Sequence, residues 1–310
     1  MENQRKAVLF GSSGLIGNNL CKKLKQEGYL VTAAGRDIER IKQRSPLADG
    51  YEQITGDLGS FEKIIRGAEA VFNFSGAPVF IKWKGDYRNE IYDSRVKLTS
   101  MIAQSILNLD QPPRVFINGT ASGIYGYDSF DDRDITEEEK TAGDFWGNLV
   151  RDWEASANMA QSERTRVVNL RTSVVLDSRE GALPQLVKVF RRGLGGPIKP
   201  GTQWFPWIHI EDEVDLAIFC SNNEKINGAV NASAPNVPRM NEFAETLGRV
   251  LDKPSRIKVP KTIIRMMFGE VSELLTNGKK VIPSKAEKNG FQFRFPVLYD
   301  ALKDLTSSED

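Results

Sequence analysis

The sequence predicts an α/β fold with a doubly wound parallel sheet and a smaller, mostly helical region toward the C-terminus. Two observations lead to this prediction. Short apolar runs typical of buried strands alternate with longer amphipathic runs typical of helices through the first half of the 310 residues. Three glycines, Gly11, Gly14 and Gly17, directly follow the first of these strands. Strand–helix alternation of this kind gives a parallel sheet with right-handed crossovers.

The expected strands and helices of the first half take turns along the chain. The strands are expected at Ala7–Phe10, Leu30–Ala34, Tyr51–Thr55, Ala70–Phe74, Val115–Asn118 and Val167–Arg171. The helices are expected at Leu15–Glu27, Ser60–Ile65, Asp86–Leu107 and Asn148–Gln161. Gly28 follows the first helix and lacks a Cβ, so it is expected to take the left-handed conformation that ends a helix.

From Ser178 the chain becomes richer in Gly, Pro and aromatic residues. A helix, a loop and a short strand through Trp207–Ile210 are expected first. Beyond residues 231–234 the pattern becomes helical, with helices expected at Asn241–Leu251, Lys261–Phe268 and Val297–Leu305.

The charge balance excludes several classes of protein. Forty-two basic residues offset 41 acidic ones and both are interspersed, so no surface for nucleic acid or an anionic membrane is predicted.

Cys21 and Cys220 lie among apolar neighbours, which predicts buried thiols in a reducing compartment. Without a signal peptide or a long apolar run, a cytoplasmic monomer or homodimer is expected, and a removed transit peptide stays compatible with the sequence.

The three glycines predict a phosphate-binding loop. Gly11 allows the tight turn, Gly14 lets the backbone approach a pyrophosphate, and Gly17 lets the helix pack close to the sheet. The helix N-terminus adds free N–H groups and a partial positive charge. The alternative is that the glycines serve close packing alone. The predicted cofactor residues here are Gly11, Ser12, Ser13, Gly14, Leu15, Ile16 and Gly17.

The end of the second strand favours NADP(H) over NAD(H). Proteins that bind NAD usually hold the ribose 2′-hydroxyl with an acidic residue at this position. Here Gly35 and Arg36 stand there, and an arginine binds a 2′-phosphate through paired N–H donors. Asp37 opposes this interpretation, because it would pair with Arg36 or bind the ribose. Residues 1–177 are thus predicted to be the NADP-binding Rossmann domain, to which 207–234 returns. Residues 178–310 are predicted to form the substrate side.

Further motifs resemble the extended short-chain dehydrogenase/reductase superfamily. They are Asp57-Leu58 after the third strand, NFSGA from Asn73 to Ala77, and Tyr125-Gly126 after the fifth strand. The chain is more closely similar to an atypical epimerase/dehydratase-like branch that is sometimes labelled cell-division inhibitor. The motifs shared with that branch are IKWKGDYRNEIYDSR, GDFWGNLVRDWEA, LRTSVVL, GLGGPI, QWFPWIHIEDEV, VNASAPN and GFQFRFP, and they span almost the whole chain.

The resemblance implies cofactor contacts outside the glycine loop. Gly35 stands where this branch commonly has Ser, which removes one side-chain hydrogen bond. Arg95 would supply positive charge facing the cofactor, or it would pair with a surface carboxylate instead. The residues implied to bind cofactor are Gly35, Arg36, Asp57, Leu58, Asn73, Phe74, Ser75, Gly76, Glu90 and Arg95.

The helix that carries the catalytic Tyr/Lys pair in active relatives lacks both residues here. Counted back from Glu154, the lysine position is Val150 and the tyrosine position is Trp146. Neither side chain exchanges a proton near neutral pH. These residues are expected to pack against the cofactor or to line an apolar pocket.

Other groups are candidates for substrate binding and proton transfer. Thr120 stands where the family has a Ser or Thr that orients the substrate oxygen, and Ser122 is a nearby alternative. Tyr125 is a candidate proton donor or a packing residue. Lys82 and Lys84 would bind an anionic substrate or simply be solvated.

Several residues have structural interpretations beside the functional ones. Asp144 is predicted to cap the helix that follows it. His209, the only histidine, lacks partners at ligand spacing, so no metal is expected and a structural role is favoured. An aromatic lip over the substrate or a small hydrophobic core is expected from Gln203, Trp204, Phe205 and Trp207.

Two classes of function remain at this stage. The first is an NADP(H)-binding oxidoreductase with an unknown small-molecule substrate and an atypical active site. The second is a non-catalytic cofactor-binding protein, such as a redox sensor or a scaffold related to cell division. Fold alone does not separate them, because function depends on the site.

Overall fold

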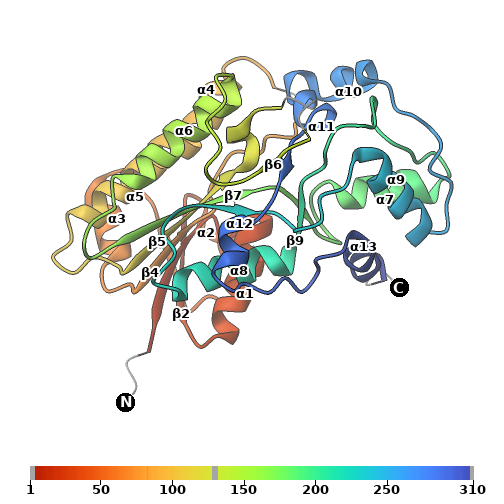
Figure 1. Ribbon diagram of the computed structural model, residues 1–310. Helices are drawn as coiled ribbons and strands as arrows, with labels where there is room; N and C mark the ends of the chain where they lie inside the picture. The colour runs from red at the N-terminus through yellow and green to blue at the C-terminus, as the bar shows by residue number, and fades with distance from the viewer. Residues whose placement is uncertain (1–3, 82, 128–131, 308–310) are drawn as a thin grey trace.

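The central element is a sheet of seven parallel strands (Figure 1). The computed structural model describes residues 4–81, 83–127 and 132–307. The strand order is β10-β7-β5-β4-β1-β2-β3. The chain therefore adds strands on one side of β1 up to β3 and on the other side from β4 onward, so the order reverses between β1 and β4. The predicted doubly wound α/β fold is confirmed. The strands are β1 (Lys6–Phe10), β2 (Leu30–Gly35), β3 (Gly50–Gln53), β4 (Ala70–Asn73), β5 (Val115–Ala121), β7 (Arg166–Thr172) and β10 (Gly228–Ala232).

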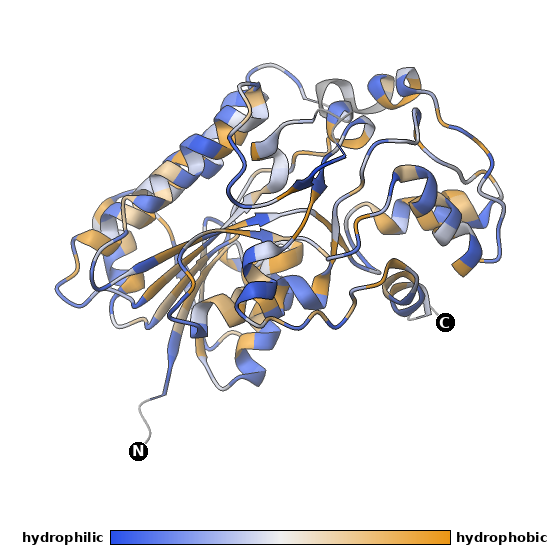
Figure 2. Ribbon diagram, in the orientation of Figure 1, coloured by the Kyte–Doolittle hydropathy of each residue, from blue (hydrophilic) through white to orange (hydrophobic). Residues whose placement is uncertain are grey.

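Helices cover both faces of the sheet. On one face lie α3 (Leu58–Ile65), α5 (Leu98–Leu107) and α6 (Phe145–Asn158), and on the other lie α1 (Leu15–Gln26) and α8 (Ile210–Asn222). Each face buries its own apolar cluster, and the strands between them are apolar along most of their length (Figure 2). Apolar burial on this scale is the main stabilising term of the fold. No helix in the described ranges is long and apolar enough to cross a bilayer.

Most element boundaries lie within a few residues of the predicted ones, and the differences have local causes. A short helix, α2 (Ile38–Arg44), was not predicted; the Asp37 carboxylate caps it by accepting from Arg40 N at 3.0 Å. α6 begins at Phe145 rather than Asn148, because Asp144 accepts from Gly147 N at 2.7 Å, as the predicted cap requires. Gly28 has a φ of 81°, as its predicted role demands.

The helix expected over Asp86–Leu107 is interrupted. Its parts are α4 (Tyr87–Tyr92), a π-helical segment (Asp93–Lys97) and α5. A π-helical turn inserts an extra residue into the helical register, and such turns are common at functional sites. Arg95 lies in this segment.

The remaining elements lie beyond β5, most of them in the C-terminal part of the chain. The chain returns to the sheet through α8 and β10, which pairs with β7. Two small parallel pairs join distant segments: β6 (Asp134–Ile135) with β11 (Lys280–Val281), and β8 (Val174–Leu176) with β9 (Trp207–His209). The helices are α7 (Leu183–Arg191), α9 (Met240–Val250), α10 (Lys261–Phe268), α11 (Glu273–Thr276), α12 (Ser284–Lys288) and α13 (Leu298–Ser307).

His209 has a structural role in this arrangement. It is 1% exposed, its Nδ1 accepts from Glu211 N at 3.1 Å at the start of α8, and its ring stacks on Phe295 at 3.8 Å. Burial lowers its pKa to about 4, so the ring is neutral at pH 7. No group of possible metal ligands occurs among the residues that the structure describes.

The predicted aromatic lip is mostly core. Trp207 is fully buried and donates to Asn236 O at 3.1 Å, and Phe205 packs on Phe243 at 4.4 Å between ring centres. Trp204 is different, because the Arg239 guanidinium lies 4.3 Å from its ring centre. The hydrophobic-core interpretation therefore describes these residues better than a lid.

Glu213 is a buried carboxyl group beside the carboxyl end of β7. Its Oε1 accepts from the Thr172 hydroxyl at 2.8 Å, and its Oε2 has no hydrogen-bond partner among the described residues. Burial raises the pKa of Glu213 to about 8, so the group is mostly protonated at neutral pH.

We predict that Glu213→Gln is more stable than the wild type at pH 8.5, and that this difference disappears near pH 4.5. A raised folded-state pKa gives stability below the unfolded-state pKa, which is lost as pH rises through the folded-state value. Urea denaturation at both pH values measures the difference, which we expect to reach a few kcal/mol. A pH-independent difference would show that Glu213 stays ionised in the fold.

Candidate functional site

The site begins where the loops after β1 and β4 meet, at the point where the strand order reverses. Gly11 has a φ of 82°, and a Cβ there would lie 2.5 Å from Phe74 C and 2.6 Å from Ser75 N. A Cβ at Gly17 would lie 2.2 Å from Gly11 O. Both glycines therefore permit contacts that any other residue would prevent. In open α/β sheets, ligands bind at this reversal point.

Gly14 differs from its two neighbours in the loop. A Cβ there would approach only Gly11 O, at 3.4 Å, so the space in front of it is open. It is also the N-cap of α1, and no side chain caps this helix. The first N–H groups of α1 are thus available to a phosphate, and the cradle fits a dinucleotide.

The end of β2 presents one unpaired cation. Arg36 makes no ion pair with any residue in the described ranges, because Asp37 is engaged as the cap of α2. The Gly35 backbone packs tightly on α2, where a Cβ would lie 2.7 Å from Ile41 Cδ1. A side chain at this position would require the end of the Ile41 side chain to move.

Asp57 and Leu58 lie at the start of α3. The Asp57 carboxylate caps this helix by accepting from Ser60 N at 2.9 Å, and the Thr55 hydroxyl donates to it at 2.5 Å. A structural role of Asp57 is thus established beside the implied cofactor contact.

Asn73 connects the site to a buried row of amides. Its side chain donates to Asn118 at 3.0 Å, Asn118 donates to Asn169 at 3.1 Å, and Asn169 donates to Asn158 at 2.9 Å. Asn73 Oδ1 also accepts from Ser75 N at 3.1 Å, which fixes the turn after β4. The row ties β4, β5, β7 and α6 together below the site, since each buried amide has a partner.

Gly76 and Arg95 lie in contact. A Cβ at Gly76 would lie 2.9 Å from the guanidinium carbon of Arg95. Arg95 donates to Ala77 O at 3.1 Å and lies 5.3 Å from the Trp153 ring centre, and burial lowers its pKa to about 10. No carboxylate pairs with it among the described residues, so the surface ion pair considered above does not form. Glu90 is exposed on α4.

Trp146 and Val150 both lie on α6, but they pack into two separate apolar clusters. Trp146 is 8% exposed and packs on Trp83 and Phe145, at 5.6 and 5.2 Å between ring centres. Val150 is buried against Ile124 and other residues beside Tyr125. Both positions are therefore packed as part of the fold, and neither presents a group for proton transfer.

Thr120 and Tyr125 belong to one buried polar network. The Thr120 hydroxyl lies 3.3 Å from Glu154 and 3.2 Å from Leu170 O. Glu154 forms two 2.8 Å bonds to Arg171, and Arg171 donates to the Tyr125 hydroxyl at 2.8 Å. This hydroxyl donates onward to Asn231 Oδ1 at 2.7 Å.

Both candidate hydroxyls are thus already engaged, and burial raises the pKa of Tyr125 to about 12. The partners come from α6, β7 and β10, far along the chain, so spacing alone did not reveal them. The available sequence signal was Arg171, a charge that follows the buried run VVNL of β7.

A second phenol, Tyr127, was missed by the sequence analysis. Its side chain packs in the cluster around Trp146. Its oxygen lies 2.6 Å from where a Cβ of Gly123 would stand, directly after β5. It makes no hydrogen bond to any described residue, and burial raises its pKa, with Asp144 and Glu273 adding to the effect. The signal for it was a second tyrosine in IYGY.

A cavity of about 220 Å³ opens beside this cluster, between α4, α6 and α11. It is lined by Arg88, Asp144, Phe145, Trp146 and Glu273. Lys84 is exposed in the preceding loop, and Lys82 lies outside the described residues.

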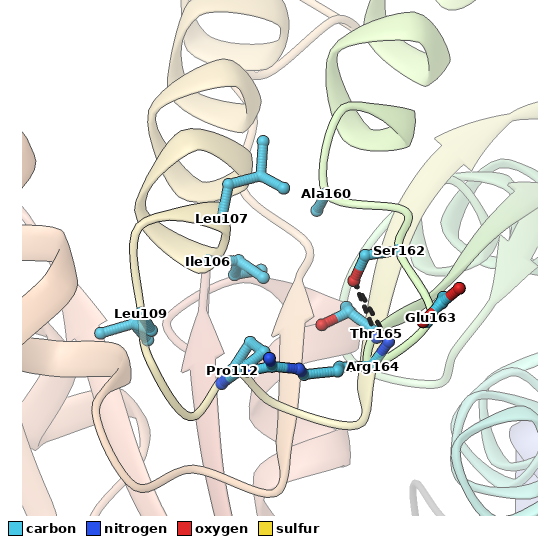
Figure 3. A pocket seen from close by; sticks show the side chains of 9 residues that line it. All are labelled: Ile106, Leu107, Leu109, Pro112, Ala160, Ser162, Glu163, Arg164 and Thr165. Atoms are coloured by element: carbon cyan, nitrogen blue, oxygen red, sulfur yellow. Dashed lines mark hydrogen bonds between the residues drawn. The ribbon is translucent and has the colours of Figure 1, made fainter.

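A larger cavity, of about 350 Å³, lies away from this site (Figure 3). Its lining includes Leu107 at the end of α5 and Thr165 just before β7. It is therefore at the amino edge of the parallel sheet, opposite the glycine loop, and takes no part in the candidate site.

Comparison with known proteins assigns the family. Residues 7–233 match the model of the NAD dependent epimerase/dehydratase family. The chain belongs to this family. Residues 259–305 of this family member match a second model, a domain of unknown function called DUF1731.

Relatives of this epimerase-family chain match over nearly its whole length. Mouse epimerase family protein SDR39U1 is 33% identical over 307 residues, covering 97% of this chain and 100% of the relative. A chloroplastic SDR39U1 homologue of Arabidopsis thaliana is 31% identical, covering 98% and 87%. The crystal structure of human SDR39U1 with NADPH superposes with a TM-score of 0.87 at 29% identity, covering 97% and 99%.

We predict that Glu154→Leu lowers the free energy of unfolding by about 3–5 kcal/mol, because it leaves Arg171 buried without its partner. The double variant Glu154→Leu/Arg171→Met should recover about half or more of this loss, since no unpaired charge remains. Urea denaturation measures all three proteins. An equal loss in the single and double variants would contradict the role given to the pair.

Proposed function

We propose that this chain is an NADP(H)-dependent oxidoreductase that acts on a small molecule without the usual Tyr/Lys pair. The observation that carries the proposal is the unpaired Arg36 beside the open glycine cradle. An oxidoreductase of this kind needs the dinucleotide, which supplies or accepts the hydride when bound.

The proposed cofactor contacts follow the geometry of the loops. The N–H groups at the start of α1 would bind the pyrophosphate, and Arg36 would bind the 2′-phosphate. Arg95, half-buried and without a carboxylate partner among the described residues, would face the nicotinamide half. The further cofactor residues that we propose are Ser12, Ser13, Leu15, Ile16, Asp57, Leu58, Asn73, Phe74, Ser75, Gly76 and Glu90.

The substrate side is proposed to be the cavity between α4, α6 and α11. Trp146 and Phe145 form its apolar wall, and Glu273 enters from the C-terminal region. This supports the division into a cofactor-binding domain, 1–177 with 207–234, and a substrate-side region within 178–310. Thr120 and Tyr125, fixed in the buried network, are proposed to hold the floor of the site in position.

We propose Tyr127 as the proton donor for carbonyl reduction. Its phenol makes no hydrogen bond to any described residue, so its proton is available to the oxygen that becomes the alcohol. The raised pKa keeps the phenol protonated until an alkoxide, which is a stronger base than the phenolate, forms beside it. The phenolate then recovers a proton from water.

A cytoplasmic location is proposed from the two buried free thiols, and the chloroplastic relative suggests an organelle as the alternative.

We predict that the wild type binds NADPH more tightly than NADH, and that Arg36→Ala removes this preference. Losing the phosphate contact should weaken NADPH binding about tenfold, equivalent to about 1.4 kcal/mol, and leave NADH binding unchanged. Fluorescence titration with both cofactors measures this, and Arg40→Ala, in the helix α2 that follows Arg36, is the control. Tighter NADH binding by the wild type would contradict the proposal.

We predict that Tyr127→Phe abolishes most NADPH oxidation on any carbonyl or sugar substrate that the wild type reduces, with NADPH affinity unchanged. The loss should be about 10²–10⁴-fold, the usual contribution of a positioned acid. Tyr92→Phe is the matched control, because Tyr92 packs in the same cluster as Tyr127 and its hydroxyl bonds Asp152 instead of facing the site. Tight NADPH binding by the wild type without turnover across a broad panel would favour the cofactor-binding sensor instead.

A further inference from the structure

Arg44, the last residue of α2, is tied to the glycine loop. Its Nε donates to Ser13 O at 3.3 Å, and the neighbouring Ser45 hydroxyl donates to Ser12 O at 2.7 Å. These contacts bring the C-terminal end of α2 against the residues directly before Gly14. The β2–α2 unit that carries Arg36 thus also places the Arg44 guanidinium at the glycine loop.

The guanidinium of Arg44 also forms an ion pair with Glu180, which lies in the loop between β8 and α7. Both side chains remain about one-third exposed, at 35% and 37%, so the pair is reachable from solvent. The partners are 136 residues apart in the chain. Exposed pairs of this kind are weak, and a stronger anion displaces such a carboxylate readily.

The charges at this corner suit a dianion when Glu180 is displaced. Arg36 and Arg44 then present two positive charges, and a phosphate monoester carries close to two negative charges at pH 7. The pyrophosphate has separate donors in the N–H groups of α1. Arg44 ends the helix that begins just after Arg36, and it reaches Ser13 O from that helix, so the 2′-phosphate is the better match for it.

We propose that Arg44 is a second 2′-phosphate-binding residue and that Glu180 is its counter-ion only while no phosphate is bound. This inference rests on the proposed NADP(H) function and adds a determinant of cofactor choice. Glu180 occupies the place of a phosphate oxygen, so it competes with NADPH and leaves NADH unaffected.

The test is fluorescence titration of NADPH and NADH into the wild type, Arg44→Met and Glu180→Gln. Arg44→Met should weaken NADPH binding about tenfold and leave NADH binding unchanged. Glu180→Gln should tighten NADPH binding by a factor of about three, again without effect on NADH. Lys42→Met is the matched control, because Lys42 lies on the same helix and pairs with Glu39. Melting temperatures confirm that each variant is folded.

The outcomes separate the inference from the function on which it rests. Equal weakening of both cofactors in Arg44→Met would assign Arg44 to the pyrophosphate or to holding the loop, and would overturn the inference. Unchanged NADPH binding in Arg44→Met would also overturn it. Unchanged or weaker NADPH binding in Glu180→Gln would overturn the role of Glu180. A wild type that binds neither cofactor would overturn the proposed function itself.

Discussion

The structure depends on how closely the ends of three neighbouring strands approach one another. The Phe74 backbone lies where a Cβ of Gly11 would stand, and the Phe74 ring lies 2.4 Å from where a Cβ of Gly119 would stand. β1, β4 and β5 can end side by side only because Gly11 and Gly119 have no side chain. The glycine loop, the turn after β4 and the turn after β5 therefore converge at one edge. Everything that we assign to function lies along this edge.

The two halves of this edge differ in what they offer a ligand. The half beside β1 and β2 is open and positively charged, with bare helix N–H groups and Arg36. The half beside β5 and α6 is packed: Trp146 and Val150 lie in apolar clusters, and Glu154 and Arg171 are buried as a pair. Replacing two residues would not restore a Tyr/Lys site, because the surrounding side chains are built around the ones present.

The sequence predicted those structural features that depend on a few adjacent residues. The tight turn at Gly11, the Asp144 cap and the left-handed Gly28 each depend on a few adjacent residues, and all three were predicted correctly. Contacts between distant segments were not predicted: Glu154 with Arg171, and Arg44 with Glu180. The aromatic residues around Trp207 were equally ambiguous, since an apolar run looks the same in a lid and in a core. α2 was missed because it is only seven residues long and depends on its Asp37 cap.

We propose that the glycine loop and the end of β2 form an NADP(H) site beside a helix that lacks a proton-exchanging pair. A crystal structure of the chain grown with NADPH tests this most directly. We expect pyrophosphate oxygens about 3 Å from the first N–H groups of α1 and the 2′-phosphate against Arg36. We also expect the nicotinamide to lie toward β5, with Trp146 still in its cluster. NADPH bound elsewhere, or bound with its 2′-phosphate away from Arg36, would contradict this proposal.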